Sequence, residues 1–169
     1  ATDLVEKGIR VLHVKWSSGE LSEVAAARGV AEAASQEAPQ RAPASQLDVA
    51  TIEPRDGQHT GTLIYLHSAG TGIAAIISHA QTFAMDGIRI LLPQAPRIRV
   101  RRLGGAFAST WFDVGLGSEE PLDQRGLEEV EERILEMAEA EARTLLQVGG
   151  GIRVAFGGYG QGGALAMHV

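Results

Sequence analysis

The stretch Ile152-Arg-Val-Ala-Phe-Gly-Gly-Tyr-Gly-Gln-Gly-Gly-Ala-Leu-Ala-Met-His-Val169 decides the fold. Its apolar, β-favouring start predicts a strand over 152–156, which runs into a turn made almost wholly of glycine, and 164–167 predict the opening of a helix. A strand, a tight turn and a helix, with glycines two residues either side of the apex, form the frame of the nucleophile elbow, Gly-x-Ser-x-Gly. The apex of this frame is Gly160, and glycine has no nucleophile to offer.

The same glycines do not spell a nucleotide-binding motif. Gly158 to Gly163 reads G-x-G-x-G-G rather than the dinucleotide fingerprint G-x-G-x-x-G, and no Lys-Ser/Thr of a P-loop follows. We therefore expect no cofactor.

Composition describes one ordinary globular domain. The chain has 169 residues, of which 44% are hydrophobic and 21% charged, and a net charge of −6 argues against nucleic acid as a partner. No apolar run reaches the roughly 18 residues of a membrane span, so no transmembrane segment is expected. The absence of cysteine excludes disulfides and thiolate metal sites, and no metal is expected. The start at Ala1 without methionine suggests a processed or partial protein. A soluble protein is expected, and its compartment stays unknown, with an organelle or a peripheral place on a membrane complex among the options.

Residues 1–50 look different from the rest and are predicted to be an N-terminal extension and linker. The segment 9–16 predicts a short strand, Ser17 or Ser18 suits the cap of a helix over 20–33, and 34–45 has the composition of a linker. The extension is interpreted either as a docking arm or as a partly ordered surface arm.

Residues 51–169 are predicted to be an α/β domain with a mostly parallel sheet and flanking helices, because apolar strands alternate with amphipathic helices. An irregular stretch is expected at 97–122. Strands are expected over 51–54, 62–66, 88–92 and 152–156, and helices over 73–85 and 123–148.

Two groups of charged residues are interpreted mainly as solvated surface. Along the helix expected at 123–148, glutamates line faces other than the apolar one, which predicts a solvated face rather than an acid–base or metal site. The arginines before it suit a solvated loop, with a docking surface for an acidic partner or a lipid head group as the alternative. These groups are Glu128, Glu129, Glu132, Glu136 and Glu139, and Arg97, Arg99, Arg101 and Arg102.

Four short motifs follow one another in a recognisable order. His67-Ser-Ala-Gly70, Pro93-Gln-Ala-Pro96, Trp111-Phe-Asp113 and Gly158-Tyr-Gly-Gln-Gly-Gly163 together resemble the acyl-protein thioesterase group of carboxylesterases. The resemblance covers roughly residues 51–169. It implies an α/β-hydrolase fold and an ancestry among enzymes that cleave thioesters and carboxyl esters of lipid chains.

The resemblance also implies where a site would lie. The oxyanion donors would be the backbone N–H groups of Ala69 and Gln161, and they would persist as a vestigial oxyanion hole because a backbone donor needs no particular side chain. His67 is more simply a loop-supporting histidine, and Trp111 and Phe112 are more simply packing residues. An acyl pocket, where one survives, would be lined by His67, Ser68, Trp111, Phe112 and Tyr159.

Three departures from the family pattern bear on catalysis. The nucleophile position is Gly160, where glycine also relieves the backbone strain of an elbow. The acid and histidine that follow the serine in this fold are not found, and His168 lies roughly 12 Å along the helix axis. The first loop carries Ser68 where the family has glycine. Neither Ser68 nor Ser109 suits a substitute nucleophile, because neither sits on an elbow and no base is assigned to it.

The sequence stops barely two turns into the last helix, so the strand over 152–156 is expected to be an open apolar sheet edge. Residues 1–50, another protein subunit or a continuation of the polypeptide would cover it. The resulting hypothesis is a catalytically inactive thioesterase-like domain that acts as a structural or docking subunit of a larger complex. One alternative is a serine thioesterase seen as a fragment or with its nucleophile substituted. The other is a binding module that holds an acyl or lipid chain without cleaving it.

Overall fold

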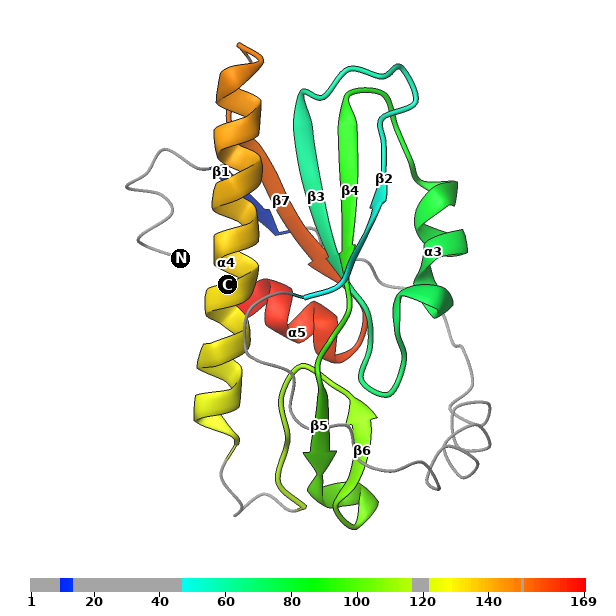
Figure 1. Cartoon of the computed structure of the whole chain (residues 1–169), viewed down its shortest axis with the longest axis vertical. Coiled ribbons are helices and arrows are strands. Elements are labelled where there is room, and N and C mark those ends of the chain that lie inside the picture. The colour runs from blue at the N-terminus through cyan, green and yellow to red at the C-terminus, as the bar shows by residue number, and fades with distance from the viewer. Residues whose placement is uncertain (1–9, 14–46, 117–121, 150) are drawn as a thin grey trace.

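The computed structural model describes residues 10–13, 47–116, 122–149 and 151–169. Its centre is a five-stranded sheet in the order β1-β7-β3-β4-β2, with a separate two-stranded sheet, β5-β6, at the lower end of the molecule (Figure 1). The strands of the central sheet are β1 (Arg10–His13), β2 (Val49–Ile52), β3 (Gly61–Leu66), β4 (Ile88–Pro93) and β7 (Arg153–Gly158). The helices are α3 (Ile73–Thr82), α4 (Gln124–Gln147) and α5 (Gln161–His168).

The sheet is parallel apart from one edge strand. β7 pairs in parallel with β3, which pairs in parallel with β4, and β2 runs antiparallel to β4 at the edge. The apolar runs of β3, β4 and β7 are buried on both faces, as parallel strands covered by helices are. The predicted fold class, α/β with a mostly parallel sheet and flanking helices, is confirmed.

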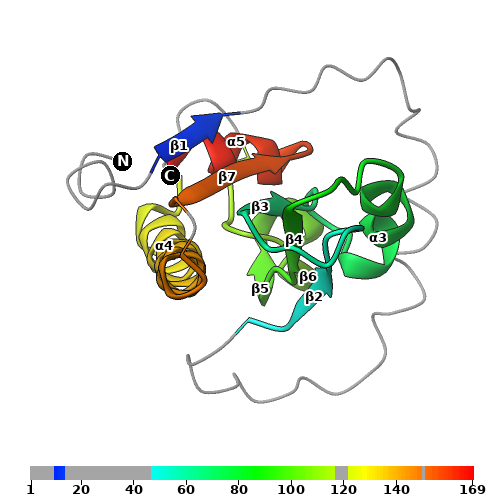
Figure 2. The ribbon, with the colours of Figure 1, turned by 90° about the horizontal axis from the view of Figure 1, so that it is seen from above.

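Alternate side chains of the strands enter two separate hydrophobic clusters, one on each face of the sheet. Ile64 and Leu66 of β3 lie in the larger cluster, with residues of α4 and α5, whereas Leu63 and Tyr65 pack in the smaller cluster, with residues of α3. Seen from above, α4 and α3 lie on opposite sides of the sheet (Figure 2). The period of two along each strand thus divides the core between the two layers of helix.

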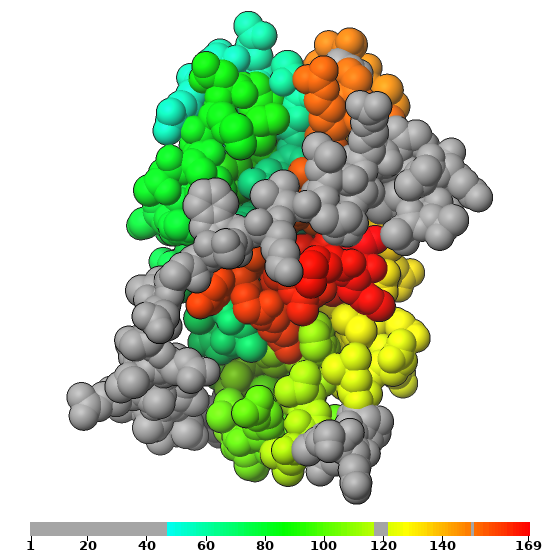
Figure 3. Space-filling view, turned by 180° about the vertical axis from the view of Figure 1, so that it is seen from behind, coloured from blue at the N-terminus to red at the C-terminus, as the bar shows by residue number. Residues whose placement is uncertain are grey.

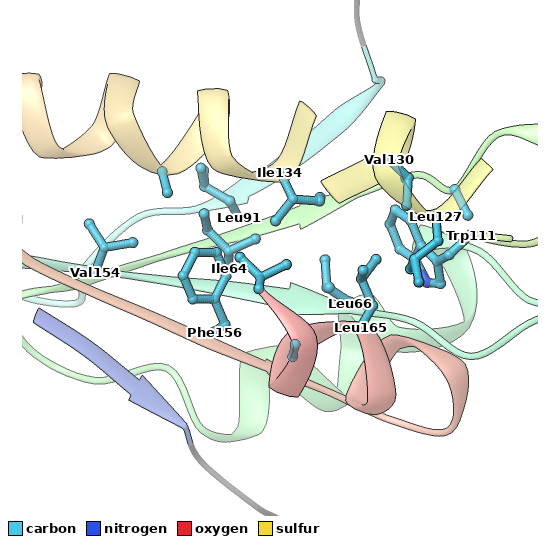
Figure 4. Close-up of a cluster of buried hydrophobic side chains, with 14 of the residues drawn as sticks. Ile64, Leu66, Leu91, Trp111, Leu127, Val130, Ile134, Val154, Phe156 and Leu165 are labelled. Atoms are coloured by element: carbon cyan, nitrogen blue, oxygen red, sulfur yellow. The ribbon is translucent and has the colours of Figure 1, made fainter. Parts of the chain in front are cut away.

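α4 covers its face of the sheet with one apolar stripe. The carboxylate of Asp123 caps the helix by accepting the Gly126 N–H at 3.1 Å. Ile134 lies over side chains of the strands, and Val130 lies beside Trp111 (Figure 4). The expected glutamates are exposed or half-buried on the remaining faces, which confirms the solvated-face interpretation. Val148, the last residue of the helix expected over 123–148, follows the end of α4 and is exposed.

Two expectations about local structure were wrong. The stretch 97–122 is not irregular throughout: β5 (Arg97–Val100) and β6 (Ala106–Ser109) form an antiparallel hairpin around the 3-10 turn η2 (Arg101–Leu103). Alternation of arginine with isoleucine and valine in β5 is a strand pattern with a period of two. α5 begins at Gln161, inside the glycine-rich turn, because the turn itself supplies the first residues of the helix.

The edge of β7 is occupied by the chain's own N-terminal region. β1 pairs in parallel with β7 from Arg10↔Arg153 to His13↔Phe156, which is the first of the three ways in which the sequence allowed this edge to be covered. The predicted strand over 9–16 is confirmed at Arg10–His13, and the helix and linker expected over 20–45 lie outside the described residues. Seen from behind, the turn and α5, in orange and red, reach the surface above the green hairpin (Figure 3).

Candidate functional site

The turn between β7 and α5 places its apex residue in a strained backbone conformation. Gly160 has φ 56° and ψ −124°, outside the regions that residues with a side chain commonly adopt. Among the described residues, positive φ occurs only at glycines. The geometry fits an elbow whose apex would normally point a side chain out of the turn, and here the apex has none.

Glycines on either side of the apex allow close backbone approach. A Cβ at Gly158 would stand 2.6 Å from the carbonyl carbon of Gly162 and 2.7 Å from the Leu66 oxygen, and a Cβ at Gly162 would also strike Leu66 O. The Tyr159 N–H donates to the same Leu66 oxygen at 3.0 Å. The turn therefore packs backbone to backbone against the end of β3, which fixes Gly160 beside the loop that follows β3.

His67, the first residue after β3, is fully buried and has both ring nitrogens in hydrogen bonds. The Ala95 N–H donates to Nε2 at 2.9 Å, so Nε2 carries no proton, and Nδ1–H donates to Ser68 O at 2.8 Å. Burial lowers the pKa of His67 below its ordinary value of 6.5, and the Ser68 carbonyl opposes this with a smaller upward effect. This neutral imidazole supports the loop and is not placed as a general base.

Two glutamines of the sequence motifs connect neighbouring loops and elements. Gln161 accepts from Thr110 Oγ1 at 2.6 Å and from the Trp111 N–H at 2.9 Å, and donates to Phe112 O at 2.7 Å. Gln94 accepts the first N–H of α3, from Ile73, at 3.0 Å.

Gln94 also links its own loop to the end of β6. Its Nε2 donates to Ser109 Oγ at 3.1 Å. The Trp111 indole donates to His67 O at 2.7 Å and so ties the loop after β6 to the loop after β3. The polar side chains of the motifs thus bind the loops at the carboxyl ends of β3, β4 and β7 to one another.

Asp113 anchors the hairpin to the same framework. Its carboxylate receives Arg101 Nε at 2.8 Å and the Val114 N–H at 3.0 Å. Asp113 is buried, whereas the Arg101 side chain is 42% exposed, so solvent screens this ion pair and its contribution is modest.

The predicted oxyanion donors keep their N–H groups free. Neither Ala69 N nor Gln161 N has a hydrogen-bond partner among the described residues, whereas the neighbouring Gly70 N–H donates to Ser109 O at 2.7 Å. Ala69 and Gln161 follow directly after Ser68 and Gly160, and the Ser68 side chain lies against Gly160.

The remaining predicted site residues divide by exposure. His67, Trp111 and Phe112 are buried, whereas Ser68 is half-buried and Tyr159 is 47% exposed. The hydrogen bonds of His67 and Trp111 fit the supporting and packing roles that the sequence suggested for them.

His168, which the sequence placed too far along the helix to act as the catalytic histidine, lies at the end of α5. Its Nε2 is 3.4 Å from Glu131 Oε2 of α4. His168 is therefore engaged away from the elbow, as the helix geometry predicted.

A second polar cluster lies at the opposite end of the strands, and no sequence motif pointed to it. Thr62 donates to Glu141 at 2.8 Å and accepts from His59 Nε2 at 2.8 Å, and Arg89 Nη1 is 3.4 Å from Glu141. Burial, and then the positive charge of Arg89, lower the pKa of His59, while Glu141 and Glu53 act in the opposite direction. This cluster joins α4 to β3 and β4.

In the part of the chain that the structure describes, no group of three or more His, Cys, Asp or Glu side chains is placed to hold a metal ion. No helix there is both long enough and apolar enough to cross a membrane.

Comparison with known proteins identifies the family. The sequence model of the phospholipase/carboxylesterase family matches residues 47–169, which is most of the chain. The chain belongs to this family. The resemblance carried by the four motifs is thereby confirmed, and the matched region begins within four residues of the predicted domain start at 51.

The proteins that the chain resembles include acyl-protein thioesterases and a lysophospholipase-like protein. Acyl-protein thioesterase 1 of Cryptococcus neoformans is 30% identical over 122 residues, covering 69% of this chain and 50% of the relative. Lysophospholipase-like protein 1 of Mus musculus is 28% identical over 119 residues, covering 67% and 48%. The crystal structure of acyl-protein thioesterase 2 from Zea mays shares the fold, with a TM-score of 0.61 and 24% identity over 71% of this chain and 49% of that one. The chain spans about half the length of the curated relatives it matches.

Proposed function

We propose that this member of the phospholipase/carboxylesterase family does not hydrolyse acyl esters and serves instead as a structural or docking subunit of a larger protein complex. The observation that carries the proposal is Gly160, which holds the apex of the elbow at φ 56° without a side chain. Acyl transfer by this architecture needs a hydroxyl at that position, activated by a histidine.

The expected deficit is large. In a hydrolase that depends on an activated serine, removing the nucleophile lowers kcat by roughly 10⁶-fold and leaves only the contribution of substrate binding and the oxyanion hole. The two serines nearest the site do not make up this loss. Ser109 Oγ is bound to Gln94. His67, the residue before Ser68, has both ring nitrogens in hydrogen bonds and is not free to activate the Ser68 hydroxyl.

A docking role is supported by how the site's side chains are used. The polar groups of His67, Gln94 and Gln161 are directed into the protein, where they connect loops, and not toward a substrate. Tyr159 of the turn and Met167 near the end of α5 are 47% and 59% exposed. A rigid scaffold with exposed aromatic and thioether groups suits contact with another protein.

The experiment that tests inactivity is turnover of an octanoyl thioester by the purified chain, compared with Ser68→Ala and Ser109→Ala variants. We expect the three proteins to show the same rate, within error of buffer alone. Hydrolysis that either substitution abolishes would overturn the proposal, because a serine of this chain would then be acting as the nucleophile. Where hydrolysis survives both substitutions, chromatography tests whether the activity co-elutes with the chain. Activity that separates from the chain is contamination and does not count against the proposal.

The docking role is tested separately by native mass spectrometry of the protein isolated from its source. We expect a stable assembly from which the chain is released together with at least one defined protein subunit. A single species of 17.8 kDa would contradict the subunit role.

A second candidate function rests on the free N–H groups of Ala69 and Gln161, which suit the carbonyl of an acyl chain that is bound but not cleaved. Titration with octanoate, followed by amide ¹H–¹⁵N shifts, tests it. Acyl binding predicts saturable shifts at these two amides and smaller shifts at Gly70, whose N–H is already bonded. Equal or absent shifts would exclude acyl binding at this site.

A further inference from the structure

Ser68 and Gly160 come from distant parts of the chain and lie against each other at the elbow. A Cβ built on Gly160 would stand 3.2 Å from Ser68 Cβ and in still closer contact with Ser68 Oγ. The second separation is shorter than real Cβ atoms show, so something must move before position 160 can carry a side chain. We call the volume that such a side chain needs the elbow space.

The Ser68 hydroxyl is not held in the elbow space by a hydrogen bond. Its Oγ has no hydrogen-bond partner among the described residues, whereas its carbonyl oxygen accepts from His67 Nδ1 and from Thr71 Oγ1, at 2.8 and 2.7 Å. The backbone of Ser68 is therefore fixed by the loop, and its side chain lies where the missing side chain at 160 leaves room.

We infer that Ser68 is a positioning residue that fills the elbow space, so that positions 68 and 160 cannot both carry a side chain in the present geometry. The inference deepens the proposed function and rests on it in one respect, which is the assignment of Gly160 as the nucleophile position. It also gives Ser68 a definite role: Ser68 takes the place of a nucleophile without its activity. A serine restored at 160 therefore meets the Ser68 hydroxyl, which has to leave the elbow space before the new side chain is accommodated.

Ser68 fills the elbow space with two atoms, Oγ and Cβ, and substitutions at position 68 remove them one after the other. Ser68→Ala removes Oγ, the atom in closest contact, but keeps Cβ at 3.2 Å from the added atom, and Ser68→Gly removes both. The strain of a side chain at φ 56° is common to every background and cancels in a double-mutant cycle. What remains in the cycle is the steric term between the two positions.

The test is a thermal-unfolding cycle that combines Gly160→Ala with Ser68→Ala, Ser68→Gly or the control Ser78→Ala, an exposed serine of α3. Gly160→Ala alone should lower Tm by several degrees, because alanine is strained at this φ. We expect Ser68→Gly to recover about 2–4 °C of that loss, Ser68→Ala to recover less, and Ser78→Ala to recover none. This graded recovery distinguishes filling of the elbow space from a general structural role of Ser68.

A second measurement follows the Ser68 side chain itself. In Gly160→Ala, the three-bond scalar couplings between Hα and Hβ of Ser68 should report a change of its χ1 rotamer as the hydroxyl leaves the elbow space. Equal Tm losses in all four backgrounds together with an unchanged rotamer would overturn the inference.

The two proposals fail in different experiments. The cycle uses no substrate, so a serine-dependent thioesterase activity would refute the proposed function while the coupling between positions 68 and 160 stood. An absent coupling in a chain without hydrolytic activity would refute only the role of Ser68.

Discussion

Replacing Gln161 by leucine tests whether the site's polar side chains hold the loops together. Gln161 lies at the start of α5 and makes hydrogen bonds with Thr110 Oγ1, Trp111 N–H and Phe112 O. Leucine has a similar size but neither accepts nor donates, so Gln161→Leu deletes these bonds without opening a large cavity.

The size of the effect depends on whether each former partner of Gln161 finds another hydrogen bond. Each bond contributes about 1 kcal/mol net, and a buried group left without a partner costs about 1–3 kcal/mol. The Thr110 hydroxyl already lies 3.2 Å from Phe112 O and can donate there instead, so these two groups remain satisfied. The Trp111 N–H has no such substitute. Three hydrogen bonds are deleted and one is replaced, so the net loss is two bonds plus part of the desolvation penalty of the Trp111 N–H. We therefore expect the free energy of unfolding to fall by about 3 kcal/mol.

Urea denaturation at pH 7 measures this loss, with Gln81→Leu on the exposed side of α3 as the matched control. The control should change the free energy of unfolding by less than about 0.5 kcal/mol. Gln161→Glu adds a pH test: its carboxylate keeps the two accepting bonds but faces Phe112 O. Relative to the wild type at the same pH, it should therefore destabilise less at pH 4, where protonation is favoured, than at pH 7. A Gln161→Leu variant as stable as the control would refute the connecting role of this side chain.

Three further predictions concern charge. Burial lowers the pKa of His59 and His67, so below pH 6.5 the unfolded chain binds protons that the folded chain does not. The free energy of unfolding should therefore be highest above pH 6.5 and fall as the pH drops below it. Urea midpoints from pH 8 to 5 measure this, and a flat profile would contradict it. Asp113→Asn removes the charge that faces Arg101 and should cost about 1 kcal/mol in low salt, less in 1 M NaCl, with a salt-independent loss arguing against the ion pair. Asp123→Ala removes the N-terminal cap of α4 and should cost about 1 kcal/mol by the same assay, and an unchanged midpoint would show that the cap is dispensable.

The sequence predicted the elements whose pattern is strong. Short apolar runs predicted the strands β3, β4 and β7, and the amphipathic period predicted the helix α4. The structure confirms these four elements. The order of the four motifs was sufficient to predict the family and its fold. Three of the motifs follow β3, β4 and β7 of the central sheet, and the fourth follows β6 of the hairpin.

The sequence did not predict features that depend on tertiary contact. The β5–β6 hairpin has short strands whose alternation is only four residues long, and the pairing of β1 with β7 joins segments far apart in the chain. The same is true of the site: nothing local in the sequence shows that Ser68 meets Gly160, or that Gln161 turns its side chain toward Trp111. Residue types indicated a hydrolase framework, and only the packed structure shows how its polar groups are used.

The central claim, that this elbow carries no reactive nucleophile, is tested most directly by intact-mass measurement after treatment with a fluorophosphonate, which bonds covalently to activated serines. The account predicts an unmodified mass for the chain under conditions that fully label an acyl-protein thioesterase of the same family. A stoichiometric adduct that maps to Ser68, or to any other serine of this chain, would contradict it.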